Sequence, residues 1–442
     1  MPPASQYAPL TQRDDDDNDE REAPPPPPGA EASPRLRDLF AIKHYPALFL
    51  VGAVFDGSRA SLLFITSAYV TEATGSPRYV QLTGTCLMVM LLLGPCFGII
   101  SDRYDRRRTV AISLATMSAI TYTVAAALYV RVFVWQLIYP FCLFVGLANV
   151  LDTTNRPALI YDLLSNAQQP QQLSNAMALR SLGAGVGGIG GVWLVGLAVE
   201  RLGIWSGFIF VAAQMSLALL LLCTVPSQPP ARKPGARPVQ DGERASVAAD
   251  LRAGLWLAWS DRPLASVLST TIIANFFYFS HAPILQLLAS ELGVSTQLGA
   301  LLLASQQGGR LFASLPFLYF KPRRLGLLYS VGIIFASCTM PILAVPSYPV
   351  VFGAEMAGSF GSGWFGATQS TLVMTAVPDD MRGRAMGLLT LSIGCQPIGM
   401  VFLGETAERI GVRPALLAFA CMGIGAHALS QLCLPQARKM VR

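Results

Sequence analysis

The 442-residue chain is 52% hydrophobic but only 13% charged, and its net charge is +6. A soluble domain needs about a quarter of its residues charged, so most of the surface of this chain must face lipid rather than water. The composition therefore excludes a soluble enzyme. The cysteines lie in apolar stretches without a C-x-x-C pair, and the histidines are scattered. Neither a disulfide framework nor a metal site is expected.

Twelve apolar segments follow an N-terminal stretch without an apolar core. Residues 1–43 hold the acidic run Asp14–Asp17 and the proline run Pro24–Pro28. This composition is typical of disorder, so we expect a disordered cytoplasmic tail. A helix needs about 20 apolar residues to span a bilayer. Segments of that kind lie at 46–70, 79–100, 109–130, 132–154, 173–199, 205–225, 263–289, 297–320, 325–345, 348–376, 385–407 and 414–434. The sequence predicts an all-α membrane protein with twelve transmembrane helices.

The longest break between these spans, residues 226–262, divides the chain. It begins rich in Pro and basic residues and ends in an amphipathic stretch at 250–259. We therefore expect a cytoplasmic linker with an amphipathic helix. This linker separates two predicted six-helix bundles, 44–225 and 263–434, and residues 435–442 form a cytoplasmic C-terminal tail.

The Lys and Arg residues indicate how the spans are oriented, because cytoplasmic loops of membrane proteins carry an excess of both. With both termini placed in the cytoplasm, the inner segments hold 24 of the 32 basic residues. We expect cytoplasmic N- and C-termini and a place in the plasma membrane.

An internal repeat supports an even number of helices. The pair Ala-Met opens the fifth span at Ala176 and the eleventh at Ala385. The segments Glu200–Gly203 and Glu408–Gly411 close the same two spans at nearly the same offset. Spans repeated in this way run in the same direction, so parallel duplication is predicted to relate two pseudo-symmetric halves.

The loop after the second span reads G-I-I-S-D-R-Y-D-R-R-R over residues 98–108. Gly98 follows Gly94 by four residues, a spacing that permits close helix packing. Asp102 stands where an acid can meet a neighbouring helix N-terminus. This loop resembles the motif G-x-x-x-D-R-x-G-R-[RK] of the major facilitator superfamily, with Asp105 in place of its second Gly. That variant is similar to the motif of the drug- and siderophore-exporting branch.

The resemblance implies the fold and the conformational motif of that family. It implies two six-helix bundles that rock around a central substrate cavity. A second segment, R-G-R-A-M-G, begins at residue 382 and also resembles the drug- and siderophore-exporting branch. The residues assigned to the motif are Gly94, Gly98, Asp102, Arg103, Arg106, Arg107, Arg382 and Arg384.

The signals for proton coupling disagree. The antiporter motif G-x-x-x-G-P-x-x-G-G of the family is matched in part by Gly183, Gly187, Gly188, Gly190 and Gly191. Gly188 stands in place of its Pro, and Val192 in place of its last Gly. The glycines are read either as an antiport determinant or as a small-residue packing seam. The R-x-x-Q-G motif that the family links to proton coupling is absent from the fourth span.

Charged side chains inside spans cost about 2.5–3.5 kcal/mol on insertion scales, so they need partners or water and mark candidate pathways. Asp56 and Arg59 lie three residues apart on the first span, close enough to share one helical face. In one interpretation Asp56 titrates during transport while Arg59 tunes it or meets an anionic substrate group. In the other, the two form a permanent ion pair that locks packing. Glu355, without an evident local partner, either exchanges protons or reaches outer water.

Polar residues in the fourth and fifth spans give weaker signals. Asp152 lies four residues before Arg156 near the inner end of the fourth span. We expect this pair to form a structural latch near the loop at 98–108 rather than a substrate site. Arg180 in the fifth span contacts either substrate or a neighbouring helix.

The seventh and eighth spans add further candidates. Asn275, Tyr278 and His281 are spaced by three residues and combine aromatic and polar surface, as a cavity for an amphipathic ligand does. The alternative is that His281 is a satisfied core residue. Gln306 and Arg310 share a face of the eighth span and contact either substrate or another helix.

These observations predict a secondary transporter that moves a small amphipathic organic molecule by alternating access, with proton-coupled efflux as the leading hypothesis. An importer or facilitator of the same fold is one alternative, and a non-transporting receptor or scaffold is another. No cofactor, metal or nucleic-acid partner is expected. The expected partners are the lipid bilayer, a small-molecule substrate and protons, and the expected state is a monomer.

Overall fold

The computed structural model describes residues 36–94, 105–169, 172–227, 261–319, 322, 324–377 and 381–440. Helices joined by short turns make up this part of the chain, which contains no β-strand. The predicted all-α fold is confirmed. Most of the expected N-terminal tail and linker lies outside the described residues, as do Gly98, Asp102 and Arg103.

The first half of the chain begins with the short helix α1, Leu36–Ala41, and continues with six longer helical segments. These are α2, Tyr45–Thr74; α3, Pro77–Val89, extended by η1, Met90–Leu93; α5, Arg106–Tyr129; α6, Ile138–Asn166, preceded by η2, Trp135–Leu137; α7, Leu173–Leu202; and α8, Ile204–Cys223.

The second half has six long segments and ends in the short helix α18, Gln436–Lys439. The first segment joins α10, Arg262–Ile273, to η4, Ala274–Tyr278, η5, Phe279–Ile284, and α11, Leu285–Glu291. The others are α12, Thr296–Tyr319; α13, Leu325–Thr339, with η6, Met340–Ala344; α14, Tyr348–Ala376; α15, Arg382–Ile393, with α16, Cys395–Ile410; and α17, Val412–Cys433.

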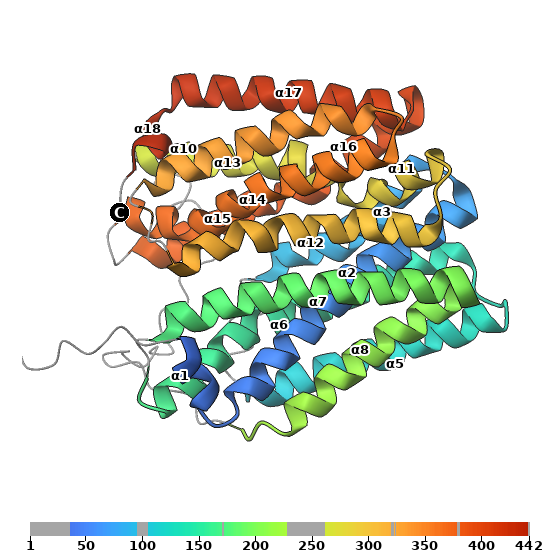
Figure 1. Ribbon diagram of the computed structural model, residues 1–442, viewed down its shortest axis with the longest axis horizontal. Helices are drawn as coiled ribbons and strands as arrows, with labels where there is room; N and C mark the ends of the chain where they lie inside the picture. The colour runs from blue at the N-terminus through green and yellow to red at the C-terminus, as the bar shows by residue number, and fades with distance from the viewer. Residues whose placement is uncertain are drawn as a thin grey trace, which may run out of the picture. The chain divides into compact units, whose positions relative to one another are not determined.

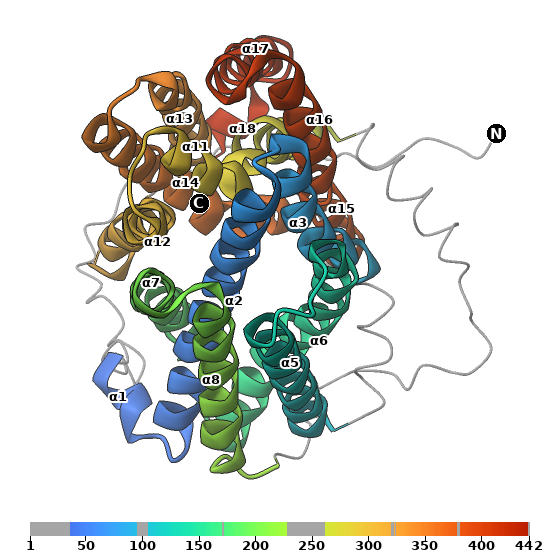
Figure 2. The same cartoon turned by 90° about the vertical axis from the view of Figure 1, so that its right-hand side faces the viewer.

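The long segments lie side by side along one direction (Figure 1), and viewed along them α5–α8 form one group and α13–α17 another (Figure 2). Nine helices in the described ranges are long and apolar enough to cross a membrane. The segment Pro77–Leu93 is shorter but also apolar. The two remaining long helices, α12 and α14, contain 24 and 29 residues. The described segments agree with the twelve predicted spans.

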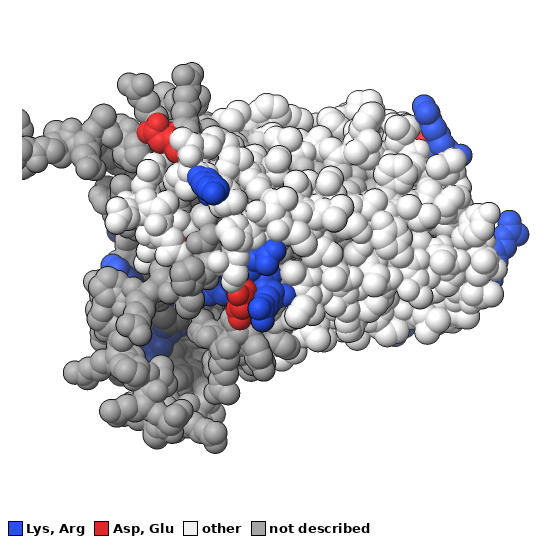
Figure 3. Space-filling model, turned by 90° about the horizontal axis from the view of Figure 1, so that it is seen from below, with Lys and Arg blue, Asp and Glu red and all other residues white. Residues whose placement is uncertain are grey.

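A belt of uncharged surface separates two charged ends. Figure 3 shows Lys, Arg, Asp and Glu side chains gathered toward both ends, with a white surface between them. Large apolar side chains are exposed on the long helices; Ile112 of α5 is 68% and Leu220 of α8 is 66% exposed. In water such a surface would drive aggregation, whereas in a bilayer it meets lipid tails. We call the end that holds Cys223 and Arg262 the linker end, and the opposite end the far end.

The predicted repeat is visible in two matching turns at the far end. Gly203 joins α7 to α8 and Gly411 joins α16 to α17, with φ values of 95° and 91°. An L-residue with a side chain is strained at such positive φ values, so Gly is required at both turns.

Glycines on α7 bring it against helices of both halves. A Cβ on Gly187 would lie 1.9 Å from the carbonyl oxygen of Ala53 on α2. A Cβ on Gly196 would lie 2.3 Å from the Cβ of Ala300 on α12, in the second half. Of the motif glycines, Gly187 therefore makes the contact that the packing-seam interpretation describes. Gly190 is different, because nothing lies within 4 Å of its added Cβ.

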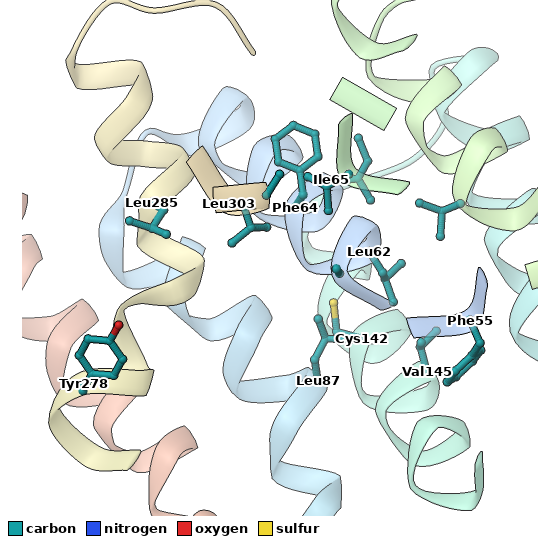
Figure 4. Close-up of a cluster of buried hydrophobic side chains, with 14 of the residues drawn as sticks. Phe55, Leu62, Phe64, Ile65, Leu87, Cys142, Val145, Tyr278, Leu285 and Leu303 are labelled. Carbon is teal, nitrogen blue, oxygen red and sulfur yellow. The ribbon is translucent and has the colours of Figure 1, made fainter. Parts of the chain in front are cut away.

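Buried apolar side chains fill the space inside the bundles and between them. Figure 4 shows Leu62, Phe64 and Ile65 of α2 near Leu285 and Leu303 of the second half. This close packing stabilises the helices by van der Waals contact, since lipid removes the hydrophobic drive between them.

The seventh predicted span, 263–289, is not one regular α-helix. The π-helix η4 and the 3₁₀-helix η5 interrupt it, and Pro283 lies within η5. Proline cannot donate the hydrogen bond that an α-helix needs, and its ring displaces the carbonyl four residues earlier. That carbonyl, of Phe279, accepts instead from Gln396 Nε2 at 3.0 Å, and the carbonyl of Ser280 accepts from Gln81 Nε2 at 3.1 Å.

Candidate functional site: a cavity between the halves

A cavity of about 310 Å³ lies between the two halves. This volume is at the lower end of the range for small-molecule sites. Side chains from both halves line the cavity, and its polar lining residues are Asp56, Arg59, Asn149, Asn275, His281, Gln306, Gln307, Arg310, Gln369 and Gln396. Its apolar lining includes Phe279 and Phe365.

Six of the sequence-predicted candidates meet in this cavity and four do not line it. Those that line it are Asp56, Arg59, Asn275, His281, Gln306 and Arg310. Those that do not are Asp152, Arg180, Tyr278 and Glu355. Two of the four contact residues at the cavity: Asp152 contacts Arg156, and Glu355 contacts His281.

On the first half, Arg156 of α6 joins two acids. Its Nη2 lies 3.0 Å from Asp56 Oδ1, and its Nη1 lies 3.3 Å from Asp56 Oδ2 and 3.0 Å from the carbonyl oxygen of Gly52. The same Nη2 lies 2.7 Å from Asp152 Oδ2, an ion pair without hydrogen-bond geometry. The guanidinium carbon of Arg156 also lies 4.8 Å from the centre of the Phe55 ring. Arg156, Asp56 and Asp152 are all buried.

This arrangement corrects one sequence interpretation. Asp56 is ion-paired with Arg156 of another helix rather than with Arg59 on its own helix. Asp152 and Arg156 form the expected pair, and Arg156 also reaches α2, whereas residues 98–104 of the loop lie outside the described residues. Sequence spacing identifies neighbours on one helix only, so it missed the partner across the bundle.

A second buried pair lies in the second half. His281 Nε2 lies 3.1 and 3.0 Å from the two carboxylate oxygens of Glu355. Its other ring nitrogen, Nδ1, bonds to the carbonyl oxygen of Tyr278. Glu355 is only 2% exposed. The expectation that Glu355 lacks a local partner or reaches outer water is therefore wrong.

The predicted stripe on the seventh span is divided. Asn275 and His281 line the cavity, whereas Tyr278 is buried between helices. The hydroxyl oxygen of Tyr278 packs so closely against α14 that it would lie 3.0 Å from a Cβ added to Gly358. Residues three apart share a face only in a regular helix. The π-helix at 274–278 and the following 3₁₀-helix break that regularity.

The three candidate arginines, Arg59, Arg180 and Arg310, have no ion pair within 4 Å among the described residues. Arg59 is exposed in the cavity. Arg310 also lines it, and its guanidinium carbon lies 5.7 Å from the centre of the Phe279 ring. Arg180 borders a much smaller void beside Arg156, outside the main cavity.

The described residues of the conformational motif make local contacts at the linker end. Arg106 Nη1 lies 2.6 Å from Asp162 Oδ2 and so joins α5 to α6, while Arg107 donates to the carbonyls of Leu222 and Cys223. Asp162 is the acid that latches this region, and the sequence analysis missed it.

Three further residues of the conformational motif, Arg382, Arg384 and Gly94, differ in their contacts. Arg382 Nε donates to the carbonyl of Met374 at 3.1 Å, and Arg384 is exposed. No described residue lies within 4 Å of a Cβ added to Gly94, and residues 95–104, which follow it, lie outside the described residues.

Asp105, where the general family motif has Gly, caps α5. Its Oδ1 accepts from the backbone N of Arg108 at 2.9 Å, and its Oδ2 accepts from Ser227. Partial burial opposes ionisation, but these hydrogen bonds outweigh it and hold the pKa of Asp105 below its usual range. The helix N-terminus requires such an acceptor, so the departure from the motif has a structural reason.

Four cavity amides escaped the sequence analysis: Asn149, Gln307, Gln369 and Gln396. Each lies inside a predicted span. Neutral amides give a weak hydropathy signal, and only their depth in the spans could have indicated them. Together they supply donors and acceptors without charge.

Polar contacts join the halves on the far side of the cavity. Ser76 Oγ donates to Glu408 Oε2 at 2.5 Å, and the backbone N of Arg78 donates to the same oxygen at 3.4 Å. In the matching position of the other half, the backbone N of Gln297 donates to Glu200 Oε2 at 2.8 Å. Two acids at the ends of α16 and α7 therefore meet the N-terminal turns of α3 and α12.

The two halves pack against each other on the far side of the cavity. Contacts of α2 with η5 and α11 cover it on the far side. Among the described helices, α6 and α14 are not packed against each other in the same way.

Comparisons with known proteins agree with this architecture. The family model described as Major Facilitator Superfamily matches residues 48–395 and 267–439. Among curated proteins, none matches the chain.

Solved transporters have the same fold at low sequence identity. The nucleoside transporter NupG is 16% identical, with a TM-score of 0.66 over 88% of this chain and 98% of that one. A bacterial homologue of the human lysosomal transporter Spinster, in an inward-facing and occupied conformation, is 16% identical, with a TM-score of 0.65 over 92% and 99%. A POT family transporter in complex with 5-aminolevulinic acid is 12% identical, with a TM-score of 0.68 over 89% and 96%.

The family match covers most of the chain, and the fold and cavity agree with it. This chain belongs to the Major Facilitator Superfamily and is a multi-pass membrane transporter rather than an enzyme.

Proposed function

We propose that this transporter moves a small amphipathic organic molecule by alternating access, as a proton-coupled exporter that works as a monomer. The observation that carries the proposal is the cavity between the halves, which combines charged groups, amides and aromatic rings in one space. Such a lining suits a ligand with one polar and one apolar end.

The contacts around the cavity support alternating access. The far side is closed by exposed polar contacts, including those of Glu200 and Glu408. Exposed contacts of this kind are weak individually, so their rupture is a feasible step in a transport cycle. Rocking of the halves would then open the far side and close the linker side.

Proton coupling is assigned to the pair His281–Glu355. His281 lines the cavity, and Glu355 binds it from behind with both oxygens at 3.0–3.1 Å. A protonatable pair in the wall of a substrate cavity can gain or lose a proton when the substrate leaves or enters. Asp56 is a weaker candidate than the sequence indicated, because Arg156 holds both of its oxygens.

The orientation follows from charge. The linker end holds the basic residues Arg106, Arg107, Arg438 and Lys439, so we assign it to the cytoplasm. In this orientation an exporter would load its substrate from the linker end. Residues 1–35 and the linker would also lie on this side, and the plasma membrane is the proposed location.

Reconstitution tests the proposal. Purified protein in liposomes is given a panel of amphipathic dyes and drugs, with and without a pH gradient. Gradient-driven efflux from the cytoplasmic side is expected. Gradient-independent flux would remove the proton coupling, and gradient-driven uptake in the opposite direction would make the protein an importer. Binding of a partner protein by residues 1–35 without any flux would favour the scaffold alternative.

A further inference from the structure

Two cavity arginines come from opposite halves, and neither is ion-paired with an acid among the described residues. Arg59 belongs to α2 of the first half, and Arg310 belongs to α12 of the second. Both line the cavity, and neither forms an ion pair within 4 Å in the described part of the chain. Two like charges facing one cavity repel each other, so the arrangement favours a ligand that separates them.

The nearby acids are already engaged. Arg156 holds both oxygens of Asp56 and is ion-paired with Asp152, and His281 holds both oxygens of Glu355. Neither Arg59 nor Arg310 shares these contacts. The positive charge on the two arginines is therefore not neutralised by a bound carboxylate of the protein.

The total charge around the cavity leads to the same conclusion. Among the described residues at the cavity and beside its wall there are four arginines, Arg59, Arg156, Arg180 and Arg310, and three acids, Asp56, Asp152 and Glu355. One positive charge remains with His281 neutral. A single anionic group would balance it, whereas a cation would add to the repulsion.

Arg310 also has unused hydrogen-bonding capacity. Its Nε is buried and has no hydrogen-bond partner in the described chain. Its guanidinium group lies over the Phe279 ring, which supports it without using its donors. A buried donor without a partner is costly, and a ligand oxygen would satisfy it. The planar guanidinium fork matches a carboxylate, sulfonate or phosphate group better than a lysine does.

We propose that the substrate is an amphipathic organic anion whose acidic group is held between Arg59 of the first half and Arg310 of the second. The apolar part of the molecule lies against Phe279 and Phe365, which line the same cavity. Because the two arginines belong to different halves, the anion couples the halves to each other. This inference rests on the proposed transport function and specifies its substrate class.

Thermal unfolding of the purified full-length protein tests the charge requirement. The probes are three acids, phenylpropionate, naphthoate and naphthalene sulfonate, each beside its neutral amide, together with inorganic sulfate. A ligand that binds only the folded protein raises its melting temperature, and the rise grows with the logarithm of the ratio of ligand concentration to Kd. The acids are expected to stabilise the protein and the amides are not. Stabilisation by neither class, or equal stabilisation by both, overturns the proposal.

Matched variants locate the binding. Arg59→Gln and Arg310→Gln are each expected to weaken binding of the acid by roughly ten- to a hundredfold, as loss of a charged hydrogen-bonding group implies. Arg201→Gln, which removes the same charge from an exposed site at the far end, is expected to leave affinity unchanged. Arg59→Lys and Arg310→Lys keep the charge and are expected to bind with intermediate affinity, which separates binding loss from misfolding. Unchanged affinity in both Gln variants overturns the proposal.

Flux measurements separate this inference from the transport function. The same acids and amides are offered to proteoliposomes. Transport of neutral or cationic compounds alone would leave the transporter proposal standing and reject the anion. Binding of acids that depends on Arg59 and Arg310 without any flux would support the anion site and reject the transport function.

Discussion

Arg156 of α6 holds Asp56 of α2 with two hydrogen bonds, Nη2 to Oδ1 at 3.0 Å and Nη1 to Oδ2 at 3.3 Å. Both side chains are buried, and 100 positions of sequence separate them. This contact fixes the first transmembrane helix against the fourth. Because Arg156 neutralises it, Asp56 is also not a free negative charge in the cavity.

Replacement of Arg156 by Met is expected to destabilise the protein strongly. Asp56 and Asp152 would then be buried acids without a counter-charge, a change that costs about 3–5 kcal/mol. Chemical unfolding in mixed micelles measures the free energy of unfolding. The triple variant Asp56→Asn, Asp152→Asn, Arg156→Met is expected to recover most of the loss, because no charge remains buried. Arg201→Met at an exposed site serves as the control, with an expected change within about 0.5 kcal/mol. If Arg156→Met were as mild as the control, the pair would not be a structural anchor.

Glu355→Gln is expected to separate proton coupling from substrate movement. The amide keeps the size of the carboxylate and a hydrogen bond to His281, but it cannot carry a proton. Accumulation driven by a pH gradient should be lost, while exchange of substrate at equal concentrations should stay within about threefold. Both rates are measured in proteoliposomes. Glu72→Gln, at an exposed position of α2, is the matched control and should change neither. Full gradient-driven transport by Glu355→Gln would assign coupling to another acid.

The helical part of the fold could be predicted from sequence because it depends on hydropathy and charge alone. Apolar length sets a span, Lys and Arg set its direction, and Gly203 and Gly411 mark the repeated turns. The break in the seventh segment was not predicted. Pro283 signals it, but the replacement partner Gln396 comes from a distant helix.

The site could be predicted only as a set of polar residues. Six of the ten candidates line one cavity. They could be identified because a polar or charged side chain inside a span needs water or a partner. Their pairing could not be predicted, since sequence spacing reports neighbours on one helix. His281 and Glu355 are 74 positions apart and meet through packing of whole helices. The neutral amides of the cavity were not predicted, because their hydropathy signal is too weak.

Two glycines of α7 should respond oppositely to the same substitution. In Gly187→Ala the new methyl group would lie 1.9 Å from the backbone oxygen of Ala53, so α7 and α2 must separate. In Gly190→Ala nothing lies within 4 Å, and Ala is the better helix former by about 1 kcal/mol. We expect Gly187→Ala to lower the melting temperature by several degrees or to prevent folding, and Gly190→Ala to leave it equal or higher. Thermal unfolding in detergent measures both. Equal melting temperatures would show that the α2–α7 seam can relax.

The paired caps at the far end should set the balance between the two conformations. Glu200 and Glu408 each place a carboxylate at the N-terminal turn of a helix from the other half, where the helix dipole favours negative charge. Gln at either position removes that charge. Each substitution is expected to raise the population open at the far end by roughly two- to tenfold. Glu408→Gln should have the larger effect, because Glu408 also accepts from Ser76.

Spin labels on the exposed residues Ala73 and Ile410, one in each half, report this change as a longer distance between them. Native cysteines are replaced for this experiment, and Glu72→Gln controls for loss of an exposed acid. The double variant Glu200→Gln, Glu408→Gln should show the sum of the two free-energy changes, since the sites lie on different helix pairs and share no partner. Distances that stay unchanged in the double variant would mean that apolar contacts of α2 with η5 and α11 close the far side without help from the caps.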